Sequence, residues 1–446
     1  MPKISIVSLG CPKNTVDSET LLIGLKKAGF VYTPDAEDAD FVFVNTCGFI
    51  EDAKRESVDE ILKLKKIKEG GGRLLVFGCL VERYRDQLMK EIPEIDALWG
   101  VGEEERIIEY CTSAANHSQG HDRPHHGYQT DKAERTGLDD WRQELRSYAY
   151  LKIAEGCNRG CTFCVIPSIR GPYRSLAPEK ILSKAEEYIS SGKKELILVA
   201  QDIVSYGNEF RGYNLCSLLK DISSLSGDFW IRLLYLYPTA VSDELLSTIA
   251  GNEKICRYLD IPLQHSEDTI LRAMGRGETK AYNVKTIAKI REAIPDITLR
   301  TTFIVGFPGE TEDDINGLKY FIEEQRFDRM GVFMYSREKG TPAARMKGQV
   351  TRKIKDRRRD EIMKIQARIS LEKNKALVGK NYKKALVDEV EGDTALARLG
   401  SQAPEIDGVV FIEETPRASH ALRQGEFVHV LITDAYDYDL KGELIE

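Results

Sequence analysis

The sequence predicts an α/β multidomain protein with an N-terminal three-layer α/β domain, a central partial (β/α)6 barrel and a C-terminal small antiparallel β-barrel. The chain of 446 residues is too long for one ordinary domain, so two or three are expected. Strand-like and helical segments alternate over residues 3–110 and again over 148–376, which is typical of parallel sheets covered by helices. Several short strand-like runs follow in residues 377–446, which is typical of a small barrel.

Composition favours a soluble globular protein, with 42% hydrophobic and 30% charged residues. No apolar run approaches the length of a membrane span, and Met1–Ile4 leads into a strand-like segment without a signal-peptide pattern. We therefore expect a cytoplasmic protein with no membrane partner. The net charge of −7 gives no support to nucleic-acid binding as the dominant interaction. The nine cysteines are widely spread, which favours metal ligation over a disulfide framework.

Residues 1–115 are predicted to form the N-terminal domain. Apolar runs predict buried strands at Ile4–Leu9, Phe41–Val44 and Leu74–Phe77. One helix is expected from about Val16 to Ala28, and a second begins at about Glu51. The capping residue expected for the first helix is Asn14 or Thr15.

A cysteine follows each of these three strands by one to three residues: Cys11, Cys47 and Cys79. The carboxyl ends of strands border the ligand crevice of an open α/β sheet, so we expect the three thiols to meet at one edge. Helix N-termini point to the same edge and favour an anionic, thiolate-bound cluster. The alternative is that cysteine, as a small hydrophobe, merely suits buried strand ends.

Residues 116–147 are predicted to be a linker, because polar and charged residues dominate and few apolar residues are present to fix a site. A metal-binding tract is the alternative, since four histidines cluster there: His117, His121, His125 and His126.

Residues 148–376 are predicted to form the central barrel. Its six strands are expected at Tyr150–Ala154, Leu196–Ala200, Trp230–Leu236, Tyr258–Leu263, Thr298–Val305 and Met330–Tyr335. Amphipathic stretches such as Pro178–Ser190 and Thr311–Gln325 supply the helices between them. A basic helical connector, residues 351–376, ends the domain and is expected to be a solvated face, with an interaction surface as the alternative. In such barrels the chemistry lies at the C-terminal strand ends.

The segment Cys157-Asn-Arg-Gly-Cys161-Thr-Phe-Cys164 follows the first of these strands with C-x3-C-x2-C spacing. Three thiolates on one loop can converge on a single metal centre, and no fourth Cys or His lies nearby, as structural zinc normally requires. A cubane cluster held by three cysteines leaves one iron open to bind a further molecule. The alternative is a buried or redox-active group of cysteines.

This spacing, with Phe163 before the last cysteine, resembles the signature of the radical S-adenosylmethionine (radical-SAM) enzymes. The resemblance implies a [4Fe-4S] cluster on the three cysteines, whose open iron chelates the methionine part of SAM and whose electron splits SAM to a 5′-deoxyadenosyl radical. Other residues expected on the same rim would complete a SAM cradle, and its glycines allow a ligand close to the backbone: Gln201, Gln264, Gly306 and Gly309.

Residues 377–446 are predicted to form the small β-barrel, with strands at Tyr382–Val387, Thr394–Leu399, Gly408–Ile412 and Phe427–Thr433. This segment holds seven Lys and Arg against fourteen Asp and Glu. A domain that binds phosphates is expected to be basic, whereas an acidic domain is suited to a basic protein partner. The alternative is that the acidic residues only aid solubility.

From end to end, the chain resembles a methylthiotransferase. That family joins a three-cysteine domain, a radical-SAM domain and a C-terminal TRAM barrel. The resemblance implies a second [4Fe-4S] cluster on Cys11, Cys47 and Cys79, which carries the sulfur to be transferred. It also implies two uses of SAM, one to methylate that sulfur and one to supply the radical that attacks an unactivated C–H bond. A reductant protein is an implied partner, and no residue is assigned as a catalytic acid or base.

The first cysteine motif, Ser8-Leu-Gly-Cys-Pro-Lys-Asn14, resembles the RimO branch, which methylthiolates the β-carbon of an aspartate in a small-subunit ribosomal protein. Val199–Asp202 and Tyr150–Gly156 also resemble that branch. Arg174-Ser-Leu176 departs from it, because an arginine is expected after the serine; no cluster ligand is affected. The alternatives are a tRNA methylthiotransferase (MiaB-like) with the same chemistry and a non-catalytic iron–sulfur protein. The remaining cysteines are expected to be structural thiols: Cys111, Cys216 and Cys256.

Overall fold

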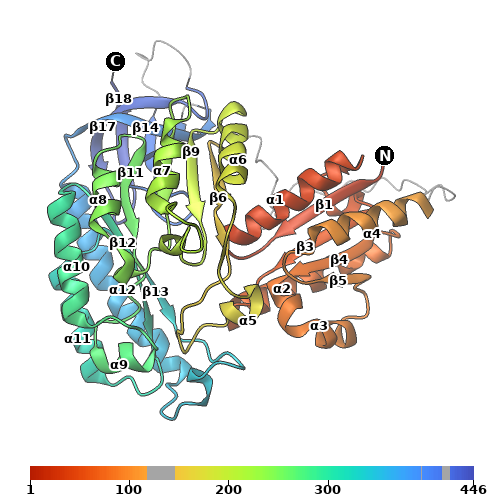
Figure 1. The fold of residues 1–446 in the computed structure, drawn as a ribbon, viewed down its shortest axis with the longest axis horizontal. Coiled ribbons are helices and arrows are strands. Elements are labelled where there is room, and N and C mark those ends of the chain that lie inside the picture. Colours follow the sequence, from red (N-terminus) through yellow and green to blue (C-terminus); the bar gives the residue numbers. More distant parts are fainter. Residues whose placement is uncertain (118–145, 393, 414–421, 446) are drawn as a thin grey trace. The chain divides into compact units, whose positions relative to one another are not determined.

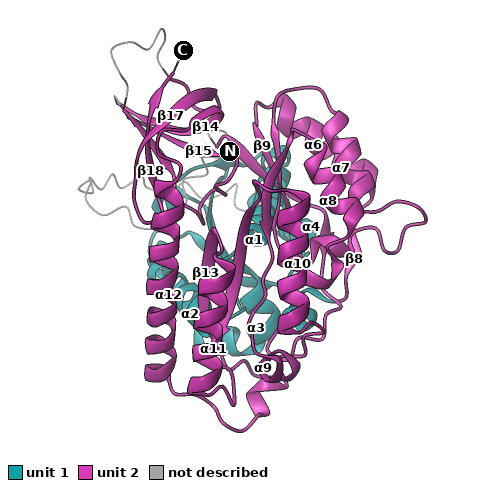
Figure 2. Ribbon diagram, turned by 90° about the vertical axis from the view of Figure 1, so that its left-hand side faces the viewer, with its two compact units in different colours: residues 1–144, 165–171 teal, residues 145–164, 172–446 magenta. Residues whose placement is uncertain are grey.

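The computed structural model describes residues 1–117, 146–392, 394–413 and 422–445. They form two compact units, residues 1–144 with 165–171 and residues 145–164 with 172–446 (Figure 2). The predicted domain boundaries remain predictions. Most of the predicted linker, including His121, His125 and His126, lies outside the described residues. His117 is the last residue of a helix.

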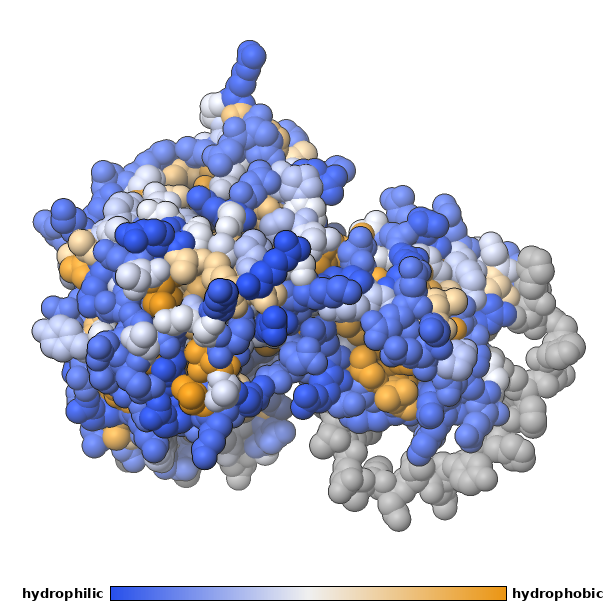
Figure 3. Space-filling model, turned by 90° about the horizontal axis from the view of Figure 1, so that it is seen from below, coloured by the Kyte–Doolittle hydropathy of each residue, from blue (hydrophilic) through white to orange (hydrophobic). Residues whose placement is uncertain are grey.

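The described helices include none that is both long enough and apolar enough to cross a membrane. On the face shown in Figure 3, hydrophilic residues predominate and hydrophobic ones form small groups.

The first unit is built on a five-stranded parallel sheet with the order β2-β1-β3-β4-β5 (Figure 1). Its strands are β1 Lys3–Ser8, β2 Val31–Tyr32, β3 Phe41–Thr46, β4 Arg73–Gly78 and β5 Ala97–Trp99. The three predicted strands are confirmed. Strands β2 and β5 were not predicted, because two or three residues are too few to show a periodic pattern.

Helices cover both faces of this sheet. Those of one face are α1 Pro12–Lys27 and α4 Glu104–His117, and those of the other are α2 Glu51–Leu64 and α3 Cys79–Glu91. Strand residues alternate between the faces, so Phe43 packs in the core beneath α1 and α4 while Val44 packs in the core beneath α2 and α3. The predicted three-layer arrangement is confirmed.

The prediction of Asn14 or Thr15 as the capping residue of α1 is wrong. The helix begins at Pro12, and Cys11 occupies the N-cap position. Proline suits the first helical position because an N–H there has no partner within the helix. Asn14 instead donates from Nδ2 to the carbonyl oxygens of Leu9 (2.8 Å) and Thr46 (3.1 Å), which ties together the C-terminal ends of β1 and β3.

The second unit begins with a six-stranded parallel sheet of order β13-β12-β11-β10-β9-β6. All six predicted strands are present, as β6 Tyr148–Lys152, β9 Glu195–Val199, β10 Trp230–Leu233, β11 Ile255–Asp260, β12 Thr298–Val305 and β13 Arg329–Met334. Helices follow the strands in turn: α6 Pro178–Ser190, α7 Leu215–Ser224, α8 Asp243–Ala250, α10 Lys280–Ala293, α11 Glu312–Gln325 and α12 Arg352–Lys375. The partial (β/α)6 barrel is confirmed.

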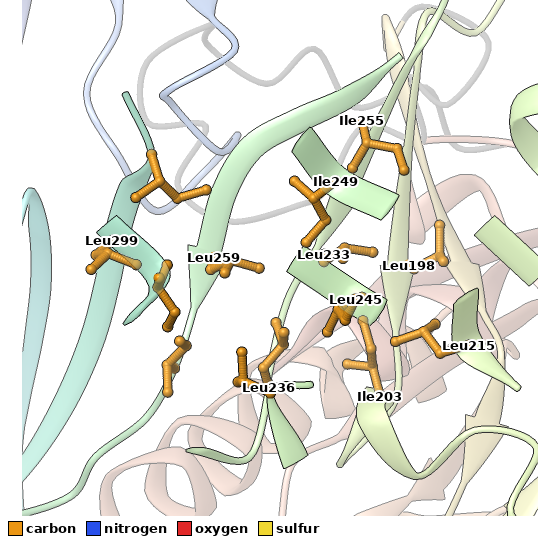
Figure 4. Close-up of a cluster of buried hydrophobic side chains, with 14 of the residues drawn as sticks. Leu198, Ile203, Leu215, Leu233, Leu236, Leu245, Ile249, Ile255, Leu259 and Leu299 are labelled. Atoms are coloured by element: carbon orange, nitrogen blue, oxygen red, sulfur yellow. The ribbon is translucent and has the colours of Figure 1, made fainter. Parts of the chain in front are cut away.

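The core of this barrel lies between the sheet and its helices. Figure 4 shows side chains from three neighbouring strands beside those of α7 and α8: Leu198, Leu233, Leu259, Leu215, Leu245 and Ile249. Each is at most 4% exposed, and burying one such side chain contributes about 1.5–3 kcal/mol. The core therefore gives the strand ends a rigid base.

A closed five-stranded barrel ends the chain, in the order β14-β15-β16-β18-β17. Its strands are β14 Asn381–Glu391, β15 Thr394–Leu399, β16 Val410–Glu413, β17 Phe427–Ala435 and β18 Leu440–Leu444. Four neighbouring pairs are antiparallel, and β16–β18 is parallel. An odd number of strands cannot alternate in direction around a closed ring, so one parallel pair is unavoidable.

Polar contacts fix this barrel to the end of the six-stranded sheet where the strands begin. Arg398 of β15 pairs with Glu195, the first residue of β9, over 2.8 Å, and Arg232 of β10 contacts the same carboxylate. The hydroxyl groups of Tyr148 and Tyr150 donate to the Glu405 carboxylate over 2.6 and 2.9 Å. The opposite end of the sheet, where the strands finish, carries the Cys157–Cys164 loop.

Candidate functional site

Three neighbouring strands of the first unit each lead into a cysteine. Cys11 follows β1 and caps α1, Cys47 directly follows β3, and Cys79 is the first residue of α3 after β4. Gly10 has a φ of +95°, and a Cβ there would stand 3.1 Å from Cys47 Sγ, so the chain before Cys11 touches Cys47. The structure thus brings the three cysteines to one edge of the sheet, and that they bind iron remains a prediction.

Burial controls the protonation of these thiols. It raises the pKa of Cys47 to about 12, and the neighbouring cysteines add to the shift. Burial also raises the pKa of Cys79 to about 11, although the positive charge of Arg170 opposes it. Both thiols therefore hold their protons at neutral pH without metal, and iron must displace those protons when it binds.

The segment after Cys164 belongs to the first unit, as residues 165–171. Its short helix α5, Ile166–Arg170, follows Val165, which packs with Ile169 and Cys79 in a small apolar cluster. Arg170 donates from Nη2 to Asn14 Oδ1 (2.7 Å) and to Asp17 Oδ2 (3.0 Å). The same nitrogen lies 3.5 Å from Cys79 Sγ. Arg170 was not predicted, because no local pattern relates it to Asn14 and Asp17, 156 and 153 positions earlier.

The donor set fits an anionic cluster with three protein ligands. Three thiols, the N-termini of α1 and α3, and a buried guanidinium meet at this edge. Within the described ranges, no three or more His, Cys, Asp or Glu side chains gather closely enough to hold one metal ion. A four-iron cluster separates its ligands further, because each thiolate binds a different iron.

The second cysteine loop, Cys157–Cys164, follows β6 and the short strand β7, Ala154–Glu155, in the second unit. Thr162 anchors it: its N–H donates to the Met274 carbonyl (2.9 Å), and its Oγ1 donates to the Ala273 carbonyl (2.7 Å). Gly275 must lack a side chain here, because a Cβ would stand 2.6 Å from the Gly160 oxygen. The residues between the cysteines are thus held, while all three thiols stay partly exposed.

Arg159 supports the same loop from within. Its Nε donates to Asp202 Oδ2 over 2.7 Å, and its guanidinium lies 3.9 Å from the centre of the Tyr237 ring. The guanidinium of Arg276 lies 4.2 Å from the same ring centre. The Arg159 backbone N–H also donates to Cys157 Sγ over 3.4 Å. Asp202 lies in the Val199–Asp202 motif, from which no role was predicted for it.

The two predicted cradle glutamines have different surroundings. Gln201 follows β9 and donates from Nε2 to Glu155 Oε1 (2.9 Å), while its buried Oε1 has no partner among the described residues. Gln264 has a φ of +70°, and its backbone is paired with β12. Phe163 packs in an apolar cluster with Phe307, which brings the cysteine loop beside the glycine loop.

The two predicted glycines differ in what approaches them. The Gly306 N–H donates to the buried Glu310 carboxylate (2.8 Å), and a Cβ there would stand 2.3 Å from Lys355 Cγ. Protein atoms, rather than open space, therefore surround Gly306. Gly309 has a φ of +84°, and no described atom lies within 4 Å of a Cβ placed there. Ligand contact at either glycine remains a prediction.

Models of three families match consecutive parts of the chain. The model described as Uncharacterized protein family UPF0004 matches residues 3–100, that of the Radical SAM superfamily matches residues 151–321, and that of the TRAM domain matches residues 378–445.

Relatives match the chain over its whole length. The Thermodesulfovibrio yellowstonii protein "Ribosomal protein uS12 methylthiotransferase RimO" is 53% identical over 445 residues and covers 100% of both chains. The proteins of the same name from Thermoanaerobacter sp. and Geobacter sulfurreducens are 45% and 44% identical. Each matches 99% of this chain, with 100% and 98% of its own length covered.

Two solved structures share the fold at low sequence identity. The radical SAM methyltransferase TsrM from Kitasatospora setae, with cobalamin and a [4Fe-4S] cluster bound, has a TM-score of 0.56 at 13% identity, covering 77% of this chain and 74% of its own. The cobalamin-dependent radical enzyme OxsB has a TM-score of 0.52 at 15% identity, covering 82% and 56%. These likenesses show the fold alone.

Proposed function

The chain belongs to the family of ribosomal protein uS12 methylthiotransferases named RimO, and we propose that it attaches a methylthio group to the β-carbon of an aspartate in uS12. The observation that carries this function is the 53% identity to such an enzyme along the entire chain. The protein is therefore a radical-SAM transferase. The tRNA-modifying and non-catalytic alternatives are not favoured, since full-length relatives share the uS12 name.

The radical-SAM domain uses a [4Fe-4S] cluster and SAM, and we propose Cys157, Cys161 and Cys164 as the ligands of that cluster. When bound, the two supply a carbon-centred radical that takes hydrogen from an unactivated C–H bond. The protein's part is to hold its thiols in place, which the anchored Thr162 and the Arg159–Asp202 ion pair support. Phe163, Gln201, Gln264, Gly306 and Gly309 are proposed as the surroundings of SAM.

A second [4Fe-4S] cluster is proposed on Cys11, Cys47 and Cys79. Their placement at three adjacent strand ends supports this assignment, as does the buried guanidinium of Arg170 beside Cys79. A cluster with three thiolate ligands carries negative charge, which the guanidinium and two helix N-termini offset. If such a cluster binds here, these three cysteines would hold it, and it would supply the sulfur to be transferred.

The acidic C-terminal barrel is proposed as the docking surface for uS12, which as a ribosomal protein is basic. Charge complementarity speeds encounter and orients the partner. The barrel is anchored where the sheet strands begin, and the Cys157 loop follows where β6 ends. The five residues of β6 span about 17 Å, so a docked substrate must extend at least that far to reach the thiols. A reductant protein and a cytoplasmic location, beside the ribosome, are also proposed.

Anaerobic reconstitution tests the cluster assignments. We expect iron and sulfide for two clusters per chain, and for one cluster in each of the variants Cys47→Ala and Cys161→Ala. Cys111→Ala is the matched control, because this buried thiol lies in the helical core of the first unit and is expected to leave both clusters intact. Equal iron in Cys47→Ala and the unmodified chain would contradict the second cluster.

Incubation with substrate tests the activity. The reduced, reconstituted enzyme with SAM is expected to add a methylthio group to the aspartate of uS12, seen by mass spectrometry of the digested substrate. Modification of tRNA with uS12 left unchanged would contradict the proposed substrate.

A further inference from the structure

The seven-residue stretch Val165–Gly171 follows the Cys157–Cys164 loop in the chain and belongs to the first unit, where Val165 and Ile169 pack with Cys79. Its last helical residue, Arg170, is 5% exposed, so its charge is almost entirely removed from water. A buried charge is costly unless paired and hydrogen-bonded. The contacts of this guanidinium therefore indicate why it is there.

One nitrogen, Nη2, makes three contacts: Asn14 Oδ1 at 2.7 Å, Asp17 Oδ2 at 3.0 Å and Cys79 Sγ at 3.5 Å. Asp17 offsets the positive charge, and its own exposure is 5%. A purely structural ion pair requires no sulfur beside it. The geometry instead directs an N–H donor at the sulfur of a proposed cluster ligand.

Donors directed at a ligand sulfur stabilise the electron-rich form of an iron–sulfur cluster, because added negative charge strengthens the hydrogen bond. A buried cation acts in the same direction, and low solvent exposure leaves its field weakly screened. Both effects favour the reduced cluster and raise its reduction potential.

We propose that Arg170 is a positioning residue that raises the reduction potential of the cluster held by Cys11, Cys47 and Cys79, with Asp17 moderating its charge. This inference rests on the proposed second cluster. Arg170, which acts on this cluster, thus lies six positions after Cys164, the last proposed ligand of the radical-SAM cluster.

The test uses the full chain with Cys157, Cys161 and Cys164 all changed to Ala, so that only the second cluster remains. In this background, Arg170→Met is expected to lower the midpoint potential of the reconstituted cluster, and Arg170→Lys to restore part of the loss. Asp17→Asn is expected to shift the potential in the opposite direction, since it leaves the guanidinium charge less compensated. A merely structural ion pair does not predict shifts of opposite sign.

The matched control is Arg73→Met, which removes a cation from the start of β4, the strand whose end leads to Cys79. The cluster in this variant is expected to have the same midpoint potential as the cluster in the background chain. Potentials that agree across the Arg170 and Asp17 variants would overturn the inference. If Arg170→Met fails to retain iron, the direction of the Asp17→Asn shift decides. A background chain that binds no iron with Arg170 intact contradicts the second cluster itself, which is a different failure.

Discussion

Arg159 Nε donates a hydrogen bond to Asp202 Oδ2 over 2.7 Å, and this contact ties the Cys157–Cys164 loop to the residues after β9. Arg159 lies between two proposed cluster ligands, and Asp202 is 3% exposed. The loop therefore keeps its shape through a side chain that binds no metal.

Asp202→Ala is expected to lower the free energy of unfolding by about 2 kcal/mol, because a hydrogen bond to a charged group contributes about 1.5–3 kcal/mol. It should also reduce the iron retained by the Cys157 loop, measured in the Cys47→Ala background. Asp228→Ala serves as the control, since its ion pair with Lys384 is exposed and contributes less than about 1 kcal/mol. Equal urea midpoints for the two variants would contradict the role of Asp202.

The Glu195–Arg232–Arg398 cluster predicts acid sensitivity. Burial alone would raise the pKa of Glu195, but Arg232 and Arg398 outweigh it and hold the pKa below the ordinary 4.5. A depressed carboxyl pKa contributes stability that is present above pH 4.5 and is lost as the pH falls through the lower folded value. Urea unfolding between about pH 7 and about pH 3 should show this loss.

Arg398→Gln tests the cause of that acid sensitivity. The variant should be less stable by about 3–5 kcal/mol at neutral pH, since it leaves a buried carboxylate with one cation fewer. Its further loss of stability on acidification should be smaller, because removing a cation raises the folded pKa of Glu195 and narrows its gap from the unfolded value. Stability curves that run parallel for the two proteins would argue against coupling between these residues.

Gly78→Ala is expected to disturb the Cys79 site. Gly78 has a φ of +98°, and a Cβ there would stand 2.3 Å from Asn45 Oδ1 and 2.9 Å from the Thr46 oxygen. Gly102→Ala isolates the backbone cost, because its φ is +76° and no described atom lies within 4 Å of the added carbon. We expect about 1–2 kcal/mol for Gly102→Ala and a larger loss, with reduced iron content, for Gly78→Ala. Equal losses of unfolding free energy in the two variants would mean that the contact of the added Cβ with Asn45 and Thr46 is relieved without cost.

The structural thiols should resist alkylation. Burial raises the pKa of both Cys111 and Cys256 to about 12, so at about pH 8 almost no thiolate is present. In iron-free folded protein, iodoacetamide should label the half-buried cysteines first: Cys11, Cys157, Cys161 and Cys164. Peptide mass spectrometry measures the order. Early labelling of Cys111, with the fold intact by circular dichroism, would contradict its buried placement.

Much of the architecture could be predicted because its strands are continuous apolar runs. The convergence of Cys11, Cys47 and Cys79 could also be predicted, since each follows a strand of a parallel sheet and parallel strands end at one edge. Contacts between distant segments could not be predicted in this way. Arg170 meets Asn14 across 156 positions, and Lys355 of α12 approaches Gly306. No local periodicity encodes such meetings, because they depend on how whole elements pack.

The excursion of Val165–Gly171 has a practical consequence for engineering. A fragment cut after the linker would lose the heptapeptide that covers Cys79 and supplies a guanidinium to Asp17. Anyone grafting the first hundred or so residues onto a foreign scaffold must transplant this stretch as well. A boundary chosen from sequence similarity alone would separate Val165–Gly171 from the unit to which it belongs.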